Sequence, residues 1–283
     1  MLQHRESPTS QDGSGDGGDH AVDLVSYGVP FRLSAKTGAL LDLMRQHAPF
    51  GSVECRSAWP DARTFAVRST EPEARYQVTA DDELLLESKT LGPALIQLGG
   101  HMMIHVAEYA PEHVFIHSGV VAWEDRALLL PGQSHAGKST LVAELVRAGA
   151  TYYSDEFALL DCEGKVHPFP RDLQMREPGK PDQTPIPLSE LNGRAGAESL
   201  PVAMVVFTEF AEGGCWAPEP VSPGRAVLEM LLHSTPVQRT PGRVLATLSA
   251  VMGHARAWRS QRGEAGVAAR SLLAALATGE PPV

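Results

Sequence analysis

The feature that most constrains the fold of this chain is a glycine-rich segment near its middle that matches the phosphate-binding pattern G-x-x-x-x-G-K-[ST]. An apolar run over residues 127–130 precedes this segment, and a helical pattern over residues 141–146 follows it. A strand, a loop and a helix in this order predict an α/β fold that binds a nucleoside triphosphate at the loop. The segment consists of Gly132, Gln133, Ser134, His135, Ala136, Gly137, Lys138, Ser139 and Thr140.

Each part of this loop has a chemical reason to be there. The two glycines allow the backbone to curl so that successive amides point inward at phosphate oxygens. The first turn of the following helix adds positive potential at the same place. We expect Lys138 to reach the β- and γ-phosphates and the hydroxyl of Ser139 to hold Mg²⁺. The cofactors predicted from this segment are therefore ATP and Mg²⁺.

Two acidic residues, Asp155 and Glu156, follow the predicted strand over residues 151–154. A strand, a phosphate loop, a helix and a second strand make one right-handed crossover unit, so the second strand should end at the edge where the loop lies. A carboxylate there can hold Mg²⁺ or accept the proton of an attacking hydroxyl. The sequence leaves open which residue does which; we favour Asp155 as the base because its shorter side chain is placed more rigidly.

His117 lies on a predicted strand over residues 114–122, shortly before the loop. Its ring could hydrogen-bond an acidic partner and tune the pKa of that partner, or it could contact the transferred phosphoryl group. The alternative is a half-buried strand histidine whose only partner is the backbone. The strand pattern alone favours neither reading.

Three segments, taken in order, resemble the HPr kinase/phosphorylase superfamily, and specifically its HPr-kinase-related branch. They are His-Ser-Gly-Val-Val at residues 117–121, the loop at 132–140, and Tyr-Ser-Asp-Glu-Phe at 153–157. The resemblance implies a P-loop kinase core with the fold shared by HPr kinase and phosphoenolpyruvate carboxykinase. It also implies transfer of phosphate from ATP to a serine hydroxyl on a protein or peptide.

The same resemblance implies roles for individual residues. Asp155 and Glu156 would serve in proton removal and metal binding, and His117 would be the strand histidine of the family. Arg171, in the segment 168–171, would contact phosphate or acceptor, and residues 257–263 would form the closing strand. Glu156 stands where the full HPr kinases have a second Asp, which points to the related branch. The Gly-rich signature that HPr kinases carry after the catalytic core is not found in this sequence, which makes HPr itself a doubtful substrate.

The patterning predicts a disordered tail over residues 1–20, a small α+β domain over 21–110 and a catalytic domain over 111–283. In the first domain we expect strands near 22–27, 64–67, 75–78 and 83–87, and helices over 37–44 and 91–110. In the second we expect a hairpin over 157–167, a loop over 178–200, a buried strand over 202–207, and helices over 223–233, 241–252 and 265–277.

Charge and cysteine usage exclude several classes of partner. The formal net charge of −10 argues against nucleic acid as a partner, because binding its backbone needs clustered Lys and Arg. The three cysteines, Cys55, Cys162 and Cys215, are widely separated, which favours a reducing compartment. We find no signal peptide and no apolar run approaching the roughly 18 residues that span a bilayer. A cytoplasmic protein without a membrane partner is therefore expected.

These observations lead to one main functional prediction and two alternatives. The main prediction is an ATP- and Mg²⁺-dependent phosphotransferase that phosphorylates a serine hydroxyl of a protein or peptide. A small-molecule kinase or ATPase is the first alternative, and a non-catalytic nucleotide-binding sensor is the second. Because full HPr kinases are hexameric, the resemblance also makes a homo-oligomer an open prediction.

Overall fold

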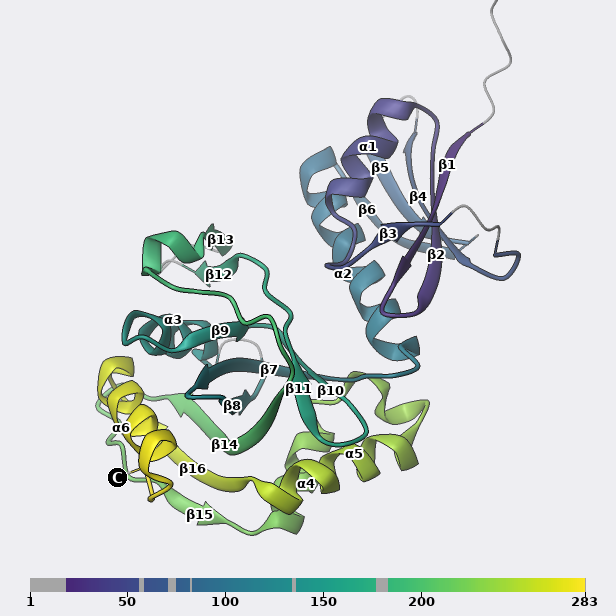
Figure 1. Cartoon of the computed structure of the whole chain (residues 1–283). Coiled ribbons are helices and arrows are strands. Elements are labelled where there is room, and N and C mark those ends of the chain that lie inside the picture. Colours follow the sequence, from purple (N-terminus) through teal and green to yellow (C-terminus); the bar gives the residue numbers. More distant parts are fainter. Residues whose placement is uncertain are drawn as a thin grey trace, which may run out of the picture. The chain divides into compact units, whose positions relative to one another are not determined.

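The structure is a computed structural model that describes residues 19–55, 59–70, 75–81, 83–133, 136–176 and 183–282. Within these residues the chain is a mixed α/β protein that divides into two compact units (Figure 1). Unit 1 holds residues 19–25, Pro30–Ala48 and Val53–Gly100; unit 2 holds Ser26–Val29, Pro49–Ser52 and the chain from His101 onward. The predicted disordered tail falls outside the described residues, except for residues 19 and 20.

Within its described part, unit 1 is built on a six-stranded sheet with the order β3-β1-β2-β4-β5-β6. Strands β2 and β4 are parallel, whereas β4, β5 and β6 pair antiparallel. Alternate residues of β2 and β4, namely Phe31, Leu33, Phe65 and Val67, are buried in its core. The elements are β1 (His20–Ser26), β2 (Val29–Ala35), α1 (Gly38–Gln46), β3 (Val53–Glu54), β4 (Arg63–Thr70), β5 (Arg75–Ala80), β6 (Glu83–Ser88) and α2 (Leu91–Tyr109), whose second half belongs to unit 2.

The described part of unit 2 contains an eight-stranded sheet with the order β11-β10-β7-β8-β14-β16-β15, in which β9 also pairs with β7. Strand β14 is parallel to both β8 and β16, and β7 is antiparallel to β8, β9 and β10. The strands are β7 (Val114–Trp123), β8 (Arg126–Pro131), β9 (Thr151–Ser154), β10 (Phe157–Leu160), β11 (Lys165–His167), β14 (Leu200–Phe210), β15 (Glu219–Val221) and β16 (Arg256–Arg262).

Helices cover both faces of this sheet and enclose two hydrophobic cores (Figure 1). Leu129 of β8 packs in the core with α4 and α5, while Leu128 and Leu130 pack in the core with α3 and α6. A strand buried on both faces must be apolar at every position, which explains the uninterrupted apolar run before the loop. The helices are α3 (Lys138–Arg147), α4 (Pro223–Leu231), α5 (Pro241–His254) and α6 (Ala265–Thr278).

After helix α3 the chain forms strand β9, which ends at the edge of the sheet where the loop lies. Helix α3 ends at Arg147, and Gly149, which follows the C-cap Ala148, has a φ of +104° that glycine adopts at little cost. Strand β9 then pairs with β7, not with β8. Because β7 is antiparallel to both, β8 and β9 run in the same direction and their carboxyl ends lie at the same edge of the sheet.

One loop prediction is corrected by the structure. Where the described residues fall within 178–200, they include β13 (Gln183–Ile186) and a 3₁₀ helix, η1 (Leu188–Leu191). Strand β13 pairs antiparallel with β12 (Leu173–Arg176) in a two-stranded hairpin. Its proline, Pro185, is compatible with a strand because each strand of a two-stranded hairpin is an edge.

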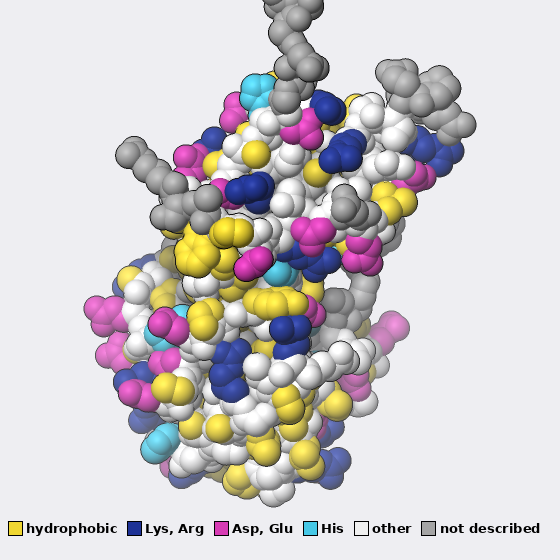
Figure 2. All heavy atoms as spheres, turned by 90° about the vertical axis from the view of Figure 1, so that its right-hand side faces the viewer, with side chains coloured by type: hydrophobic (Ala, Val, Ile, Leu, Met, Phe, Trp, Pro, Cys, Tyr) yellow, Lys and Arg dark blue, Asp and Glu magenta, His cyan; other side chains and the backbone are white. Residues whose placement is uncertain are grey.

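The surface of the molecule carries charges of both signs. Lys and Arg side chains are interspersed with Asp and Glu side chains on the face that Figure 2 draws. In the part of the chain that the structure describes, no helix combines the length and the apolar character needed to cross a membrane.

Candidate functional site

The loop between β8 and α3 is described except for Ser134 and His135. Gly137 is the N-cap of α3 and has a φ of +78°, a left-handed conformation that costs residues with a Cβ about 1–2 kcal/mol. A Cβ at this position would also clash with the guanidinium of Arg262. The backbone conformation therefore favours the second glycine of the phosphate-binding pattern, and a larger residue would also have to displace the end of the Arg262 side chain.

Lys138 lies inside the curve of the loop and is only 8% exposed. Its Nζ donates hydrogen bonds to the carbonyl oxygens of Gly132, at 2.8 Å, and Gln133, at 2.7 Å. Burial lowers the pKa of Lys138 to about 8, although the charge of Asp155 acts in the opposite direction. Because the ammonium of Lys138 is shielded from solvent, its positive charge would interact strongly with an anion that binds in the loop.

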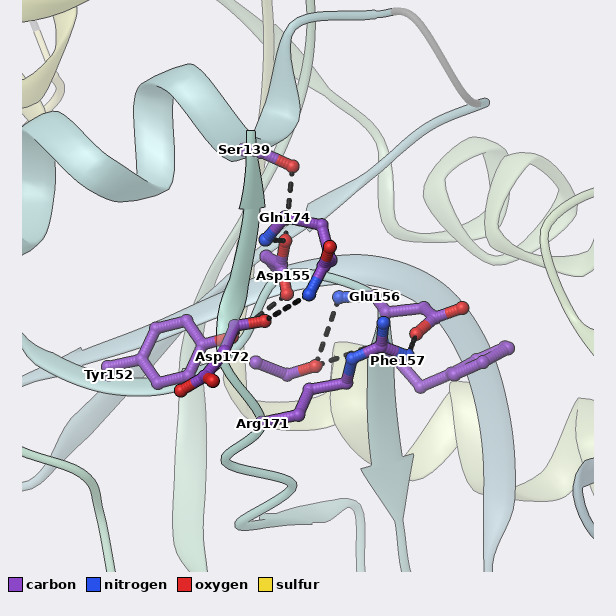
Figure 3. Close-up of polar contacts among 9 residues, drawn as sticks. Ser139, Tyr152, Asp155, Glu156, Phe157, Arg171, Asp172 and Gln174 are labelled. Carbon is purple, nitrogen blue, oxygen red and sulfur yellow. Dashed lines mark hydrogen bonds and ion pairs between the residues drawn. The ribbon is translucent and has the colours of Figure 1, made fainter. Parts of the chain in front are cut away.

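Asp155 lies beside the first turn of α3, where three donors hold its buried carboxylate (Figure 3). The hydroxyl of Ser139 donates to Oδ2 at 3.2 Å, and the backbone amide of Gln174 donates to the same oxygen at 2.9 Å. The phenol of Tyr152 donates to Oδ1 at 2.9 Å. Burial and the charge of Asp155 both raise the pKa of Tyr152, so this phenol stays a donor. The structure thus brings together two of the predicted site residues, Ser139 and Asp155.

The turn that presents the acidic pair is fixed by Ser154, the last residue of β9. Its buried hydroxyl accepts hydrogen bonds from the amides of Glu156, at 3.1 Å, and Phe157, at 3.0 Å. The carbonyl of Glu156 accepts from the amide of Ser118 on β7, at 3.0 Å. Because short side chains that bond to nearby amides stabilise turns, the backbone from which the two acidic side chains extend is held in a defined position.

Glu156 does not join Asp155 at the loop. Its Oε2 forms an ion pair with Nη1 of Arg171, and both side chains are about one-third exposed (Figure 3). The structure therefore brings the predicted phosphate or acceptor contact, Arg171, to the second carboxylate of the pair. Such a pair is open to solvent and to an incoming ligand.

His117 lies on β7 close to both Lys138 and His233. Its carbonyl accepts a hydrogen bond from the amide of Gly132 at 3.3 Å, and its amide donates to the carbonyl of His233 at 2.8 Å. Burial, followed by the charges of Lys138 and His233, lowers the pKa of His117 to about 4. The ring is therefore neutral at pH 7, and no hydrogen bond joins it to Asp155 or Glu156, both of which the structure describes.

Three contributors to the site were not assigned a role from the sequence. Tyr152 and Gln174 hold Asp155, as described above. Arg262, at the end of β16, is 2% exposed and donates from Nη2 to the carbonyl of Gly137 at 2.6 Å. The residue pattern carries no signal for Arg262, because its strand holds two further arginines, Arg256 and Arg259, that are not buried. Gln174 contributes its backbone amide, which every residue except proline has, so the residue type at this position does not indicate the role.

The oxygens of Ser139 and Asp155 suit a magnesium ion. They lie 3.2 Å apart and belong to a hydroxyl and a carboxylate, which are hard donors. Mg²⁺ is usually held by one or two carboxylates together with substrate phosphates and several waters. Among the described residues no group of three or more His, Cys, Asp and Glu side chains could hold a metal by itself. A site at Ser139 and Asp155 would therefore depend on a phosphate ligand.

Two cavities open beside the loop, and we name each after a helix that borders it. The α6 cavity has a volume of about 600 Å³ and adjoins the start of α3. Its lining includes Gly137, Thr140, Glu144, Phe210, Arg262 and Glu264. The α4 cavity has a volume of about 860 Å³ and adjoins the start of the loop. Its lining includes Gly132, Gln133, Leu228, Glu229, His233 and Arg259.

Neither protein-family models nor curated proteins match this chain. The resemblance to the HPr kinase/phosphorylase superfamily therefore stays a prediction that rests on the three sequence motifs alone. The motif at 132–140 contacts the motif at 153–157 through the Ser139–Asp155 hydrogen bond. It contacts the motif at 117–121 through the hydrogen bond between Gly132 and His117. Three segments that are separate in the sequence thus form one continuous site.

Proposed function

We propose that this chain is an ATP- and Mg²⁺-dependent serine kinase of the HPr-kinase-like type, which phosphorylates a hydroxyl on a protein or peptide. The observation that carries the proposal is the contact between Ser139 and Asp155, with the buried ammonium of Lys138 in the same loop. A phosphate-binding lysine, a metal-binding hydroxyl and a carboxylate are the parts that phosphoryl transfer needs.

In this proposal the loop amides and Lys138 would bind the β- and γ-phosphates, and the hydroxyl of Ser139 would hold the metal ion. Bound Mg²⁺ would neutralise charge that develops on the phosphate oxygens. The acceptor hydroxyl attacks the γ-phosphorus in line, so that a new O–P bond forms while the bond to the β-phosphate oxygen breaks and ADP leaves. Asp155 takes the hydroxyl proton, which leaves the phosphorylated acceptor neutral at that oxygen.

The other predicted residues have supporting roles in the same proposal. Arg171 can move its guanidinium from Glu156 to a phosphate, because the pair is partly exposed and worth little by itself. Glu156 would then be free to contact the metal ion or the acceptor. His117, neutral at pH 7, would contact the phosphoryl group as a hydrogen-bond partner that carries no charge.

The remaining expectations belong to the proposal as well. They are a P-loop kinase core like that of HPr kinase and phosphoenolpyruvate carboxykinase, a cytoplasmic location, and a serine-bearing protein or peptide as partner. The interspersed charges in Figure 2 and the net charge of −10 support a partner other than nucleic acid. Self-association into a homo-oligomer also remains a proposal.

The test is transfer of label from γ-labelled ATP, with Mg²⁺, to macromolecules in an extract of the native cells. We expect label on serine of a discrete protein or peptide with the wild-type chain and none with Asp155→Asn. The matched control is Asp42→Asn, which makes the same change at a carboxylate that is 72% exposed. This control should transfer label as the wild type does.

Each other result points to a different function. ATP consumption without a labelled macromolecule would favour a small-molecule kinase or ATPase, and no consumption at all would favour a nucleotide sensor. If Glu156→Gln abolishes transfer while Asp155→Asn retains it, Glu156 is the proton acceptor. If Asp155→Asn retains full transfer and Glu156→Gln does too, the acidic pair has no catalytic role.

A further inference from the structure

We propose that the α6 cavity binds the nucleoside part of the triphosphate, with the base against Phe210. This inference rests on the proposed function, because it assumes that the phosphates occupy the loop. It adds a position for the nucleoside, which the proposed function leaves unassigned. The volume of about 600 Å³ is within the range of roughly 300–1,000 Å³ that encloses small-molecule ligands.

The position of the cavity agrees with the direction of the triphosphate chain. The transfer end of the chain lies near Ser139 and Asp155, so the nucleoside must leave the loop elsewhere. The α6 cavity is bordered by Gly137 and Thr140 at the start of α3, and neither Ser139 nor Asp155 belongs to its described lining. It therefore adjoins the loop while lying away from the transfer end.

Phe210 gives this cavity an aromatic surface that a base can stack on. It is the last residue of β14 and is 55% exposed, which is unusual for a phenylalanine. Its amide donates to the carbonyl of Ala136 at 3.3 Å, so its backbone is tied to the loop itself. Stacking of a nucleobase on an aromatic side chain is favourable for every base, because each has a π-face.

Polar groups around the ring match the rest of a nucleoside. Arg262 is 2% exposed, and its Nε has no hydrogen-bond partner among the described residues. Arg262 also lines the cavity, so its positive charge would attract the phosphate that joins the nucleoside to the loop-bound part of the chain. The carboxylates of Glu144 and Glu264 can accept hydrogen bonds from ribose hydroxyls or from an exocyclic amino group.

The α4 cavity is the rival position, and it differs from the α6 cavity chiefly in how little of its aromatic side chain is exposed. The guanidinium of Arg259 forms an ion pair with Glu229 and lies over the ring of Phe207, 5.7 Å from its centroid. Phe207 is 5% exposed, so its ring offers little surface to a base. Leu228 in this cavity is 65% exposed and provides a matched apolar side chain for a control.

The test compares two probes, Mg·ATP and Mg·tripolyphosphate, by isothermal titration calorimetry. The variants are Phe210→Ala and the control Leu228→Ala, each of which truncates an exposed apolar side chain next to one cavity. We expect the wild type to bind ATP more tightly than tripolyphosphate. Phe210→Ala should weaken ATP binding by roughly tenfold and leave tripolyphosphate binding unchanged. Leu228→Ala should change neither affinity.

The results separate failure of this inference from failure of the proposed function. If Phe210→Ala leaves ATP affinity unchanged, the nucleoside does not use the α6 cavity, although the loop still binds phosphate. A selective loss of ATP affinity in Leu228→Ala would place the nucleoside in the α4 cavity and overturn the inference. If the wild type binds neither probe, nucleotide binding itself fails and the inference fails with it.

Discussion

Lys138 should carry a measurable pH-dependent cost to the stability of the folded protein. Its pKa is about 8 in the folded state against an ordinary value of 10.5, because burial disfavours the charged form. That difference corresponds to about 3 kcal/mol. The unfolded chain binds the proton of Lys138 more tightly than the folded protein does. The contribution of Lys138 should therefore raise the free energy of unfolding of the wild type as pH increases from about 8 to 10.5.

The substitution Lys138→Met isolates this effect, because other groups titrate alike in both proteins. It also removes two hydrogen bonds to loop carbonyls, which contributes an offset that depends little on pH. We expect the unfolding free energy of the variant, relative to wild type, to fall by about 3 kcal/mol between pH 7 and 10.5.

The assay is urea unfolding followed by tryptophan fluorescence. Three of the four tryptophans, Trp123, Trp216 and Trp258, belong to unit 2, so the signal reports mainly on the unit that contains Lys138. A difference between the two proteins that stays constant from pH 7 to 10.5 would refute the depressed pKa. It would also refute the picture of a buried cation in the loop.

Three further changes test the site and its surroundings. Tyr152→Phe removes a hydrogen bond to a buried carboxylate, so thermal unfolding should show a loss of about 1.5–3 kcal/mol; an unchanged melting temperature would contradict this. Gly196→Ala places a Cβ against the buried ring of Tyr153 and should cost about 1–3 kcal/mol, whereas Gly224→Ala, with open space around its Cβ, should not destabilise. Because the pKa of His117 is about 4, the folded protein should lose stability as pH falls from 6.5 towards 4. The drop in melting temperature between pH 7 and pH 5 should therefore be smaller in His117→Gln than in the wild type.

Local features of the site were predictable because they depend on neighbours in the sequence. The apolar run of β8, the two glycines and the helical pattern of α3 place the loop without any long-range information. Such elements are specified by backbone conformation and by the period of the apolar residues.

The partners that complete the site could not be predicted in the same way. Arg262 reaches Gly137 across 125 positions of the chain, and the amide of Gln174 reaches Asp155 across 19. The pairing of β9 with β7, which brings Ser154 opposite Val120, is also long-range, and no local pattern encodes it. Hairpin β12–β13 was missed because Pro185 reads as a loop residue unless its strand is known to be an edge.

The most direct test of the central claim is the affinity for Mg·ATP of the wild type, Lys138→Ala and Asp155→Asn at pH 7. The account predicts that Lys138→Ala weakens binding by roughly 10- to 100-fold, because it removes a charged donor to phosphate. Asp155→Asn should keep its affinity within a few fold, since the loop amides and Lys138 remain, while losing transfer. Equal ATP affinity in the wild type and Lys138→Ala would contradict the claim that this loop is the nucleotide site.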